Sequence, residues 1–401
     1  MTSACDESAK LVITGMGAVG AFGGSAQELW SALLAGHSLA RPSKRLAEAP
    51  MAAEVTDFDL MTFRRSAKAS RSPRVSQFAL AAAAQAINAS GLSGKGIDKD
   101  EVAIVYGTGN GPSEIIERNL RSILKGGLGG VEPLGFQESV FNAPASMVSI
   151  EYGFRGPLIA LPMGWGAGGF ALTTAADLIS FGHAPVALVI AADDHTRLTF
   201  DSLAALKLVG DTVRPFDRRS NGTVIGEGSA ALVVERRDHA QKRGATVLAE
   251  LAGWSSVGDI APLGAKMGQP EGLHDGMRQA MGAAGVSSVD VVYAGSYCTK
   301  DADLAEARAI HTASGNARVT NIRGVIGEPK GPTGLLNVIA AIHSIKTGIV
   351  PPTVGFEEAD PGCPPIAVSP ETQRLERIDT VLCNSFWIHG TNNSCLLRSP
   401  Q

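Results

Sequence analysis

Short β-branched and apolar runs alternate along this chain with longer stretches in which apolar residues recur at helical spacing, a pattern typical of α/β proteins. In the first half we expect strands at residues 11–14, 102–106, 186–191 and 233–235, and helices at 27–35 and 167–181. In the second half we expect strands at 247–251, 291–294, 380–383 and 394–397, and helices at 272–284, 302–314 and 334–347. The pattern therefore predicts an α/β protein made of two duplicated βαβαββ halves, residues 1–245 and 246–401, packed as one body.

The first expected strand runs into three glycines, Gly15, Gly17 and Gly20, for which we expect a tight turn. A Gly-x-Gly sequence after a strand is a weak sign of dinucleotide binding. No acidic residue closes a second strand about 20 residues later, so a Rossmann site is not expected.

The composition and charge of the chain argue against several classes of function. The chain has 401 residues, 44% of them hydrophobic, which is ample material for a large buried core. A net charge of −4 gives no polybasic signature for nucleic acid or an anionic membrane, and no apolar run is long enough to span a bilayer. Its five cysteines form no CxxC pair, so we expect neither a disulfide framework nor a metal site, and we expect a cytoplasmic protein.

Four motifs in a fixed order carry a family resemblance. They are Val-Ile-Thr-Gly-Met-Gly at 12–17, Arg-Gly-Pro at 155–157, Phe-Asp-Arg-Arg at 216–219, and Cys-Asn-Ser-Phe at 383–386. With these motifs the chain resembles the β-ketoacyl synthase (condensing enzyme) family of the thiolase superfamily over about residues 10–398. The resemblance implies a thiolase-like five-layer αβαβα sandwich that works as a dimer.

Active members of that family use a cysteine nucleophile at the start of a buried helix, two histidines, and a supporting lysine. Matching the motifs places Trp165 at the nucleophile position. Gly295 and Glu328 fall at the two histidine positions, and Arg323 falls at the lysine position. The resemblance thus implies that the nucleophile and both histidines are absent together, which predicts no intrinsic catalysis.

A glycine-containing gate normally follows the fourth motif. In this chain Trp387, Ile388 and His389 stand where the family has Gly-Phe-Gly. Because glycine alone adopts the required backbone angles freely, the altered gate is not expected to swing. His389 is expected to pack in the gate rather than to act as a base.

The chain is most similar to the chain-length-factor (β) subunits of type II polyketide synthases. Such a subunit forms a heterodimer with a cysteine-bearing α ketosynthase and receives acyl chains from an acyl carrier protein, which supplies the phosphopantetheine, so no cofactor of its own is expected. The resemblance places Asn110, Phe136 and Gln137 at the acyl tunnel or the dimer interface. An aromatic and a polyene pathway both stay open, because aromatic systems commonly have glutamine where this chain has Trp165.

Two other functions stay open at this point. The chain could be a homodimeric condensing or acyl-transfer enzyme with an atypical nucleophile such as Cys298, or an acyl-binding module. Glu328 and Lys330 could form an acid–base pair, although a salt bridge in the loop is the expectation. Asp193, Asp194 and His195 are not expected to bind metal, because neighbouring side chains on a strand point to opposite faces.

Overall fold

The computed structural model describes residues 10–46, 51–94, 96–131, 133–259, 271–387 and 390–400. Its strands are β1 (Leu11–Val19), β2 (Val102–Thr108), β3 (Leu158–Pro162), β4 (Val186–Asp193), β5 (Gly228–Arg236), β6 (Ala249–Gly258), β7 (Val291–Tyr293), β8 (Arg318–Thr320), β9 (Ile349–Val350), β10 (Ala367–Val368), β11 (Gln373–Arg374), β12 (Thr380–Trp387) and β13 (Thr391–Arg398). Its α-helices are α1 (Ala26–Ala35), α2 (Arg74–Ser90), α3 (Ser113–Gly126), α4 (Pro133–Gln137), α5 (Ala143–Tyr152), α6 (Ala167–Ser180), α7 (Arg197–Ala205), α8 (Arg237–Lys242), α9 (Glu271–Ala283), α10 (Lys300–Ser314), α11 (Arg323–Ile326) and α12 (Thr333–Thr347).

The large sheet contains the same five-strand pattern twice. Its strand order is β10-β8-β7-β12-β13-β6-β1-β5-β4-β2-β3. In the first half β5 pairs antiparallel with both β1 and β4. Strand β2 then pairs parallel with both β4 and β3. In the second half β13 pairs antiparallel with both β6 and β12. Strand β7 then pairs parallel with both β12 and β8. The halves meet where β1 pairs with β6, so the predicted duplication is present in the topology.

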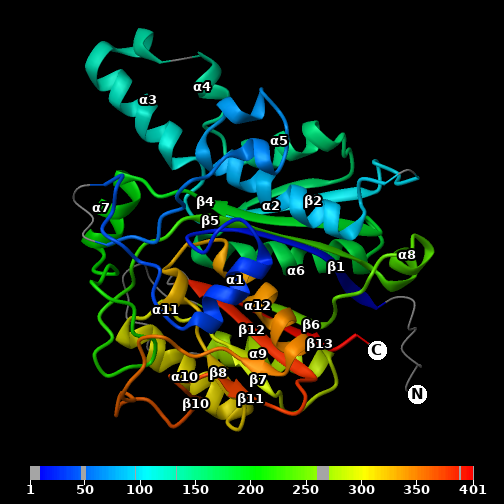
Figure 1. Cartoon of the computed structure of the whole chain (residues 1–401), viewed down its shortest axis with the longest axis vertical. Coiled ribbons are helices and arrows are strands. Elements are labelled where there is room, and N and C mark those ends of the chain that lie inside the picture. The colour runs from blue at the N-terminus through cyan, green and yellow to red at the C-terminus, as the bar shows by residue number, and fades with distance from the viewer. Residues whose placement is uncertain are drawn as a thin grey trace.

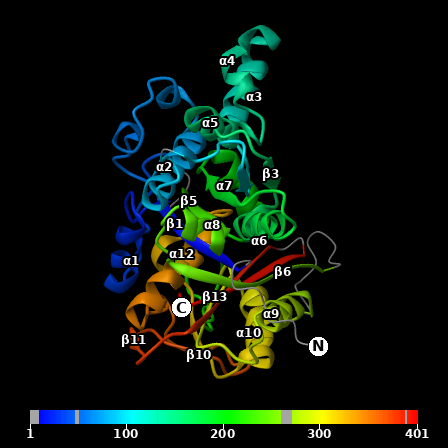
Figure 2. The ribbon, with the colours of Figure 1, turned by 90° about the vertical axis from the view of Figure 1, so that its right-hand side faces the viewer.

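Alternating strand residues divide between a central and an outer helical layer, as a strand's two-residue period requires. On β2, Ala103 and Val105 pack in the central core beside α6 and α12, whereas Val102, Ile104 and Tyr106 pack with α2 and α5 on the outer face. Helices α9 and α10 cover the outer face of the second half. Figures 1 and 2 show the resulting stack of helix, sheet, helix, sheet and helix, with α3 and α4 projecting beyond it.

The glycine-rich turn predicted after residue 14 is wrong, because β1 continues through Val19. Its glycines serve a close approach of helix α2. A Cβ atom on Gly15 would lie 2.2 Å from the carbonyl oxygen of Ala86, and one on Gly17 would lie 2.2 Å from that of Ala82. Glycine is needed here because the helix backbone lies directly on the strand.

None of the helices in the described part of the chain combines the length and the apolar character needed to cross a bilayer.

Candidate functional site

Trp165 lies between β3 and α6, in a short 3-10 turn formed by Gly164–Gly166. Helix α6 begins directly afterwards and contacts α12 through glycines at the two helix starts. The Gly168 N–H donates to the carbonyl of Gly331 at 3.1 Å, and a Cβ on Gly168 would lie 2.4 Å from that oxygen. The site is therefore formed where the two central helices begin, one from each half of the chain.

Trp165 is packed inside an aromatic cluster, which we define as Trp165, Tyr297, Phe386 and Trp387. Only 2% of Trp165 is exposed. Its ring centroid lies 4.0 Å from that of Trp387 at a tilt of 32°, and 5.5 Å from that of Tyr297 in an edge-to-face arrangement. Tyr297 also lies 5.9 Å from Phe386. Aromatic contacts of this kind fix ring positions and bury a large apolar area.

The altered gate residue Trp387 fits against the backbone beside Trp165. Gly164 has a φ of +63°, and a Cβ there would lie 2.3 Å from Cδ1 of Trp387. Gly164 therefore provides both the left-handed backbone angle and the space for the indole. The other two predicted gate residues, Ile388 and His389, lie outside the described residues.

Gly295, predicted at the first histidine position, lies just beyond β7. Its N–H donates to Oε1 of the buried Glu306 at 2.8 Å. A Cβ on Gly295 would lie 2.8 Å from the carbonyl oxygen of Asn384, so a histidine would require the neighbouring strand β12 to shift. The position accommodates glycine and holds no acid or base.

Glu328 and Arg323, predicted at the second histidine and the lysine positions, form a buried ion pair. Nε of Arg323 donates to Oε2 of Glu328, and both side chains are almost fully enclosed. The other carboxylate oxygen accepts from the Lys330 N–H at 2.7 Å and from the Thr333 hydroxyl at 2.6 Å. Both oxygens of the Glu328 carboxylate are thus occupied by fixed partners.

The expected salt bridge between Glu328 and Lys330 is wrong. Lys330 adopts a φ of +71°, and its ammonium group donates to the carbonyl of Gly226 at 2.8 Å. Only its backbone N–H reaches Glu328. The local turn sends the Lys330 side chain away, so the buried carboxylate pairs with Arg323 from α11 instead.

Asp193 connects the loop after β2 to the loop before α12. Its carboxylate accepts from the N–H groups of Gly109, Asn110 and Gly331 at 2.7–2.9 Å and from the Thr108 hydroxyl at 2.9 Å. Within the described ranges no group of three or more His, Cys, Asp or Glu side chains is arranged to hold a metal ion. The carboxylate therefore serves as a structural acceptor for both loops.

Family models match most of the chain. The N-terminal domain of β-ketoacyl synthases matches residues 8–240, and the C-terminal domain matches residues 248–357. The chain belongs to the β-ketoacyl synthase family.

Relatives of full length support this assignment. The 3-oxoacyl-[acyl-carrier-protein] synthase 2 of Coxiella burnetii is 31% identical, and the match covers 98% of this chain and 99% of that protein. The solved structure of a β-ketoacyl synthase from Burkholderia phymatum has a TM-score of 0.90 at 26% identity, covering 98% of this chain and 100% of that one. The ishigamide ketosynthase/chain length factor has a TM-score of 0.91 at 28% identity, covering 98% and 99%.

Cys298, the alternative nucleophile considered for this chain, is fully buried. Its Sγ contacts the Ser296 carbonyl at 3.8 Å, and its backbone has a φ of +64°. Burial, reinforced by the charge of Asp303, raises the pKa of this thiol well above its ordinary value. Because the thiolate is the attacking species, the geometry does not favour catalysis by Cys298.

The three residues predicted at the acyl tunnel or the dimer interface are more exposed than the aromatic cluster. Asn110 is half-buried, and its N–H donates to Asp193. Phe136 and Gln137 end α4 and are exposed, with 63% of Phe136 accessible. An aromatic side chain left this open on the single chain is consistent with an interface position, which remains a prediction.

Two members of the cluster, Tyr297 and Phe386, were not among the predicted site residues. Phe386 belongs to the fourth family motif, and Tyr297 falls within the run that the resemblance places at the first histidine. Tyr297 contacts Trp165, which is more than a hundred residues away in sequence, and Phe386 joins the cluster through Tyr297. The available signal was the aromatic Tyr297 in the run predicted to replace the first histidine, whereas Phe386 gave no signal because it belongs to a family motif.

Proposed function

We propose that this chain is a non-catalytic ketosynthase-like subunit, a chain-length factor, that pairs with an active α ketosynthase in type II polyketide or polyene biosynthesis. One observation carries the proposal. Trp165, at the position predicted for the nucleophile, is locked in the aromatic cluster between Tyr297 and Trp387. An indole cannot attack a thioester, and no Cys, Ser or Thr lies between Ala160 and Leu172 to replace it.

The predicted acid–base positions support the same proposal. Gly295 offers no ionisable side chain, and both oxygens of Glu328 are occupied by Arg323, Lys330 and Thr333. Decarboxylation of a malonyl unit needs donors aimed at the developing negative charge. In this chain Glu328 is instead bonded to Arg323, and the Gly295 N–H is bonded to Glu306.

A partner surface is available on the first half. Strand β3 is the last strand of the large sheet, and its residues are half-buried or exposed at an open edge. Large apolar side chains are exposed on and near α3, α4 and α5: Leu120, Leu124, Leu128, Phe136, Val140, Phe141 and Ile150. An exposed apolar surface next to an open strand edge favours association with another chain.

The similarity to the ishigamide ketosynthase/chain length factor supports a heterodimer rather than a homodimer. In the proposed complex the partner contributes the nucleophilic cysteine and the histidines. This chain completes the acyl tunnel and limits the chain length. The phosphopantetheine arm arrives on an acyl carrier protein, so this chain needs no cofactor of its own.

The test is co-expression with the cysteine-bearing ketosynthase encoded nearest to this chain, followed by native mass spectrometry and elongation with malonyl carrier protein and a primer. We expect a one-to-one complex that elongates only when both chains are present. A homodimer of this chain that becomes acylated would overturn the proposal.

A matched pair of variants locates the interface. Leu124→Glu places a charge on the apolar surface of α3, where 86% of Leu124 is exposed, and we expect it to abolish co-purification of the partner. Leu206→Glu, at a half-exposed leucine beyond α7, is the control and should leave the complex intact. Equal loss in both variants would contradict the assigned surface.

A further inference from the structure

Asp303 is a buried carboxyl group that connects two turns from different halves of the chain. It projects from the start of α10 and is only 2% exposed. Its Oδ2 accepts from the Phe216 N–H at 3.0 Å and lies 2.7 Å from the hydroxyl oxygen of Ser220, and its Oδ1 accepts from the hydroxyl of Ser296. One carboxyl group therefore holds the turn at residues 216–220 against the turn at residues 296–298.

The hydrogen bonds of Ser220 favour a proton on Asp303. Oγ of Ser220 lies 2.7 Å from Oδ2 of Asp303 and also 2.7 Å from the carbonyl oxygen of Cys298. A hydroxyl group has a single hydrogen, and a carbonyl oxygen cannot donate. If Ser220 donated to an ionised Asp303, its oxygen and the Cys298 carbonyl would face each other at 2.7 Å with no hydrogen between them. A neutral Asp303 that donates to Ser220, while Ser220 donates to Cys298, satisfies both contacts.

The surroundings of Asp303 favour the neutral form as well. Burial raises its pKa to about 7, although the hydrogen bonds with Ser296, Ser220 and Phe216 oppose the rise. The buried carboxylate of Glu227 is the contrasting case.

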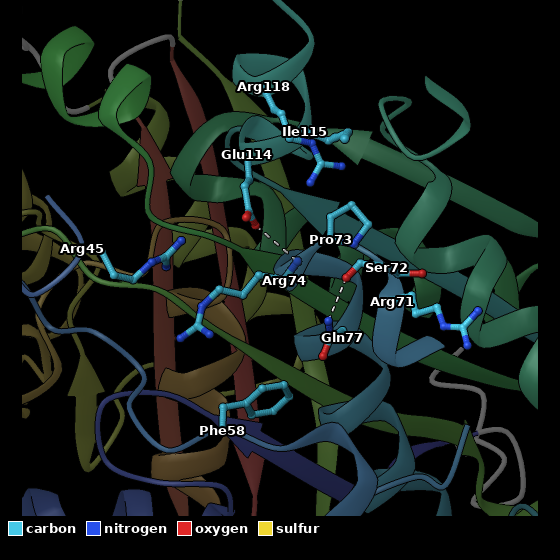
Figure 3. Close-up of a pocket in the computed structure, with 10 residues that line it drawn as sticks. All are labelled: Arg45, Phe58, Arg71, Ser72, Pro73, Arg74, Gln77, Glu114, Ile115 and Arg118. Carbon is cyan, nitrogen blue, oxygen red and sulfur yellow. Dashed lines mark hydrogen bonds between the residues drawn. The ribbon is translucent and has the colours of Figure 1, made fainter. Parts of the chain in front are cut away.

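In Glu227 each oxygen lies 2.8 Å from a guanidinium nitrogen, one from Arg45 and one from Arg74, and Figure 3 shows these two arginines close together. Burial would raise the pKa of Glu227, but hydrogen bonds and charge from Arg74, with the charge of Arg45, lower it. Asp303 is bonded to hydroxyl and amide groups instead, which do not compensate a buried negative charge to the same extent.

Glu306, the other buried acid of α10, has the partners of an ionised group. Its Oε1 accepts from the Gly295 N–H and from the side-chain amide of Asn384, and its Oε2 accepts from the Ser296 N–H, at 2.7–2.9 Å. Burial raises the pKa of Glu306, and these three hydrogen bonds oppose the rise. Because all three partners donate, the geometry assigns the charge to Glu306 and the proton to Asp303.

The other titratable groups around Asp303 leave this assignment unchanged. Burial raises the pKa of Tyr297 and of Cys298, and it raises that of Cys363 to about 11, so all three are neutral at pH 7. Charged groups on the elements beside Asp303 occur in pairs of opposite sign, Arg323 with Glu328 and Asp217 with Arg219. Asp301, at the start of α10, is exposed to solvent.

Both connected turns contain a backbone angle that depends on the surrounding fold. Phe216 has a φ of +61° and Cys298 a φ of +64°, a region that residues other than glycine rarely adopt. Such angles persist where neighbouring contacts hold them. Tyr297, which packs edge-to-face on Trp165, precedes Cys298 directly. Loss of the hydrogen bonds around Asp303 should therefore loosen a member of the aromatic cluster.

We propose that Asp303 is a pH-sensitive switch that holds the 296–298 turn, and with it Tyr297, in place while it carries a proton. When the proton passes to solvent, the Ser220 hydroxyl turns to the carboxylate. The Cys298 carbonyl then keeps only its bond from the Gly222 N–H at 2.9 Å, and the turn is released. The aromatic cluster is thus fixed at acidic pH and loosened above neutral pH, whichever partner the chain binds.

The first test compares the wild type with Asp303→Asn by denaturant unfolding of the full chain between pH 5 and pH 9. The folded pKa of Asp303 exceeds the unfolded value of about 3.9, so its contribution to stability is fully present below about pH 4 and is lost as pH rises through 7. The amide loses the bond from Phe216, a cost that is equal at every pH. Relative to the variant, the unfolding constant of the wild type should rise about tenfold per pH unit from pH 5 to about pH 7, and level off above it.

Asp301→Asn is the matched control on the same helix, and its ratio to the wild type should be constant. A constant ratio for Asp303→Asn would overturn the proposal, because an Asp303 that is ionised throughout this range does not titrate.

The second test needs only the wild type. Cys298 and the half-buried Cys363 are labelled with a small disulfide reagent, and the labelled peptides are quantified by mass spectrometry. Because the pKa of both thiols lies above the range, their thiolate fractions rise together with pH, and the ratio of the two labelling rates reports access to Cys298. We expect that ratio to rise about tenfold between pH 6 and pH 8.5, in step with deprotonation of Asp303. In Asp303→Asn it should stay constant. An unchanged ratio in the wild type would show that Asp303 does not control the turn, and would overturn the proposal.

Discussion

The indole rings of Trp165 and Trp387 lie with their centroids 4.0 Å apart, and Gly164 leaves the space that brings them together. One ring comes from the turn before α6 and the other from the end of β12, so the contact joins the two halves of the chain. Trp165 stands at the position predicted for the nucleophile, and Trp387 stands at the predicted gate. Their contact fills the space between the two predicted positions with packed rings.

Truncation of Trp165 should therefore destabilise the fold. We expect Trp165→Ala to lower the free energy of unfolding by about 3–5 kcal/mol, because a large buried ring leaves a cavity among Tyr297, Phe386 and Trp387. Denaturant unfolding followed by far-UV circular dichroism measures the loss. Phe181→Ala, at a ring that is 74% exposed, is the control and should change stability by less than about 0.5 kcal/mol.

Trp165→Cys tests whether the site can be reactivated by the nucleophile alone. We expect no condensing activity, since Gly295 and Glu328 supply no proton transfer or oxyanion donors. Elongation of a primer by the purified variant would show that the site retains hidden catalytic groups, and would argue against a dedicated structural subunit.

The buried pair of Arg323 and Glu328 leads to a second stability prediction. Arg323→Met leaves the Glu328 carboxylate without its charge partner and should cost about 3–5 kcal/mol. The double variant Arg323→Met with Glu328→Gln removes both charges and should cost less than the sum of the single changes. A double-mutant cycle by denaturant unfolding measures the coupling.

An exposed pair provides the comparison for that cycle. Nε of Arg197 lies 2.6 Å from Asp201 on α7, with both side chains partly exposed. Arg197→Met should cost no more than about 1 kcal/mol, because water and salt screen a surface pair. Additive effects at Arg323 and Glu328 would mean that their contact contributes no coupling.

The sequence was informative where one face of an element is buried and where a glycine ends a helix. Helix α1 ends before Gly36 and α12 before Gly348, both with left-handed backbone angles, close to the predicted bounds. Helix α2 was not predicted, because alanine is buried on nearly every side of it and leaves no amphipathic stripe. Packing on both sides is a tertiary property that hydrophobic spacing does not show.

The contacts within the predicted site could not be read from the sequence. The family resemblance assigned Trp165, Gly295, Glu328 and Arg323 to the nucleophile, histidine and lysine positions, and this assignment stays a prediction. The choice of Arg323 over Lys330 as partner of Glu328 depends on the positive φ of Lys330, which the sequence pattern does not indicate. A non-glycine residue at such a backbone angle is set by the surrounding fold.

Stability should depend on pH through Asp194. This carboxyl is fully buried, and Oδ1 has no hydrogen-bond partner among the described residues. Burial raises its pKa to about 7; Lys330 opposes the rise, whereas the charges of Glu114, Glu227 and Asp193 add to it. The folded state therefore binds a proton more tightly than the unfolded state, whose pKa is about 3.9. The contribution of Asp194 to stability is fully present below about pH 4 and is lost as pH rises through 7.

Asp194→Asn tests this dependence, because the amide cannot ionise. Relative to the wild type, the variant should gain about 2–3 kcal/mol of stability between pH 5 and pH 8. Denaturant unfolding at a series of pH values measures the difference. Asp201→Asn, at an exposed carboxylate, is the control and should follow the wild type. A constant difference between Asp194→Asn and the wild type over this range would show that Asp194 does not titrate there.

The exposed ring of Phe136 should set product length in the proposed heterodimer. If it closes the end of the partner's acyl tunnel, Phe136→Ala opens space for a longer chain, and each additional methylene is worth about 1–3 kcal/mol of discrimination in an apolar pocket. We expect the main product to lengthen by about one extension unit. Mass spectrometry of products from the one-to-one complex measures the shift, with Leu206→Ala as a control on a different surface. An unchanged product distribution from an intact Phe136→Ala complex would remove Phe136 from the tunnel and leave it a role in association alone.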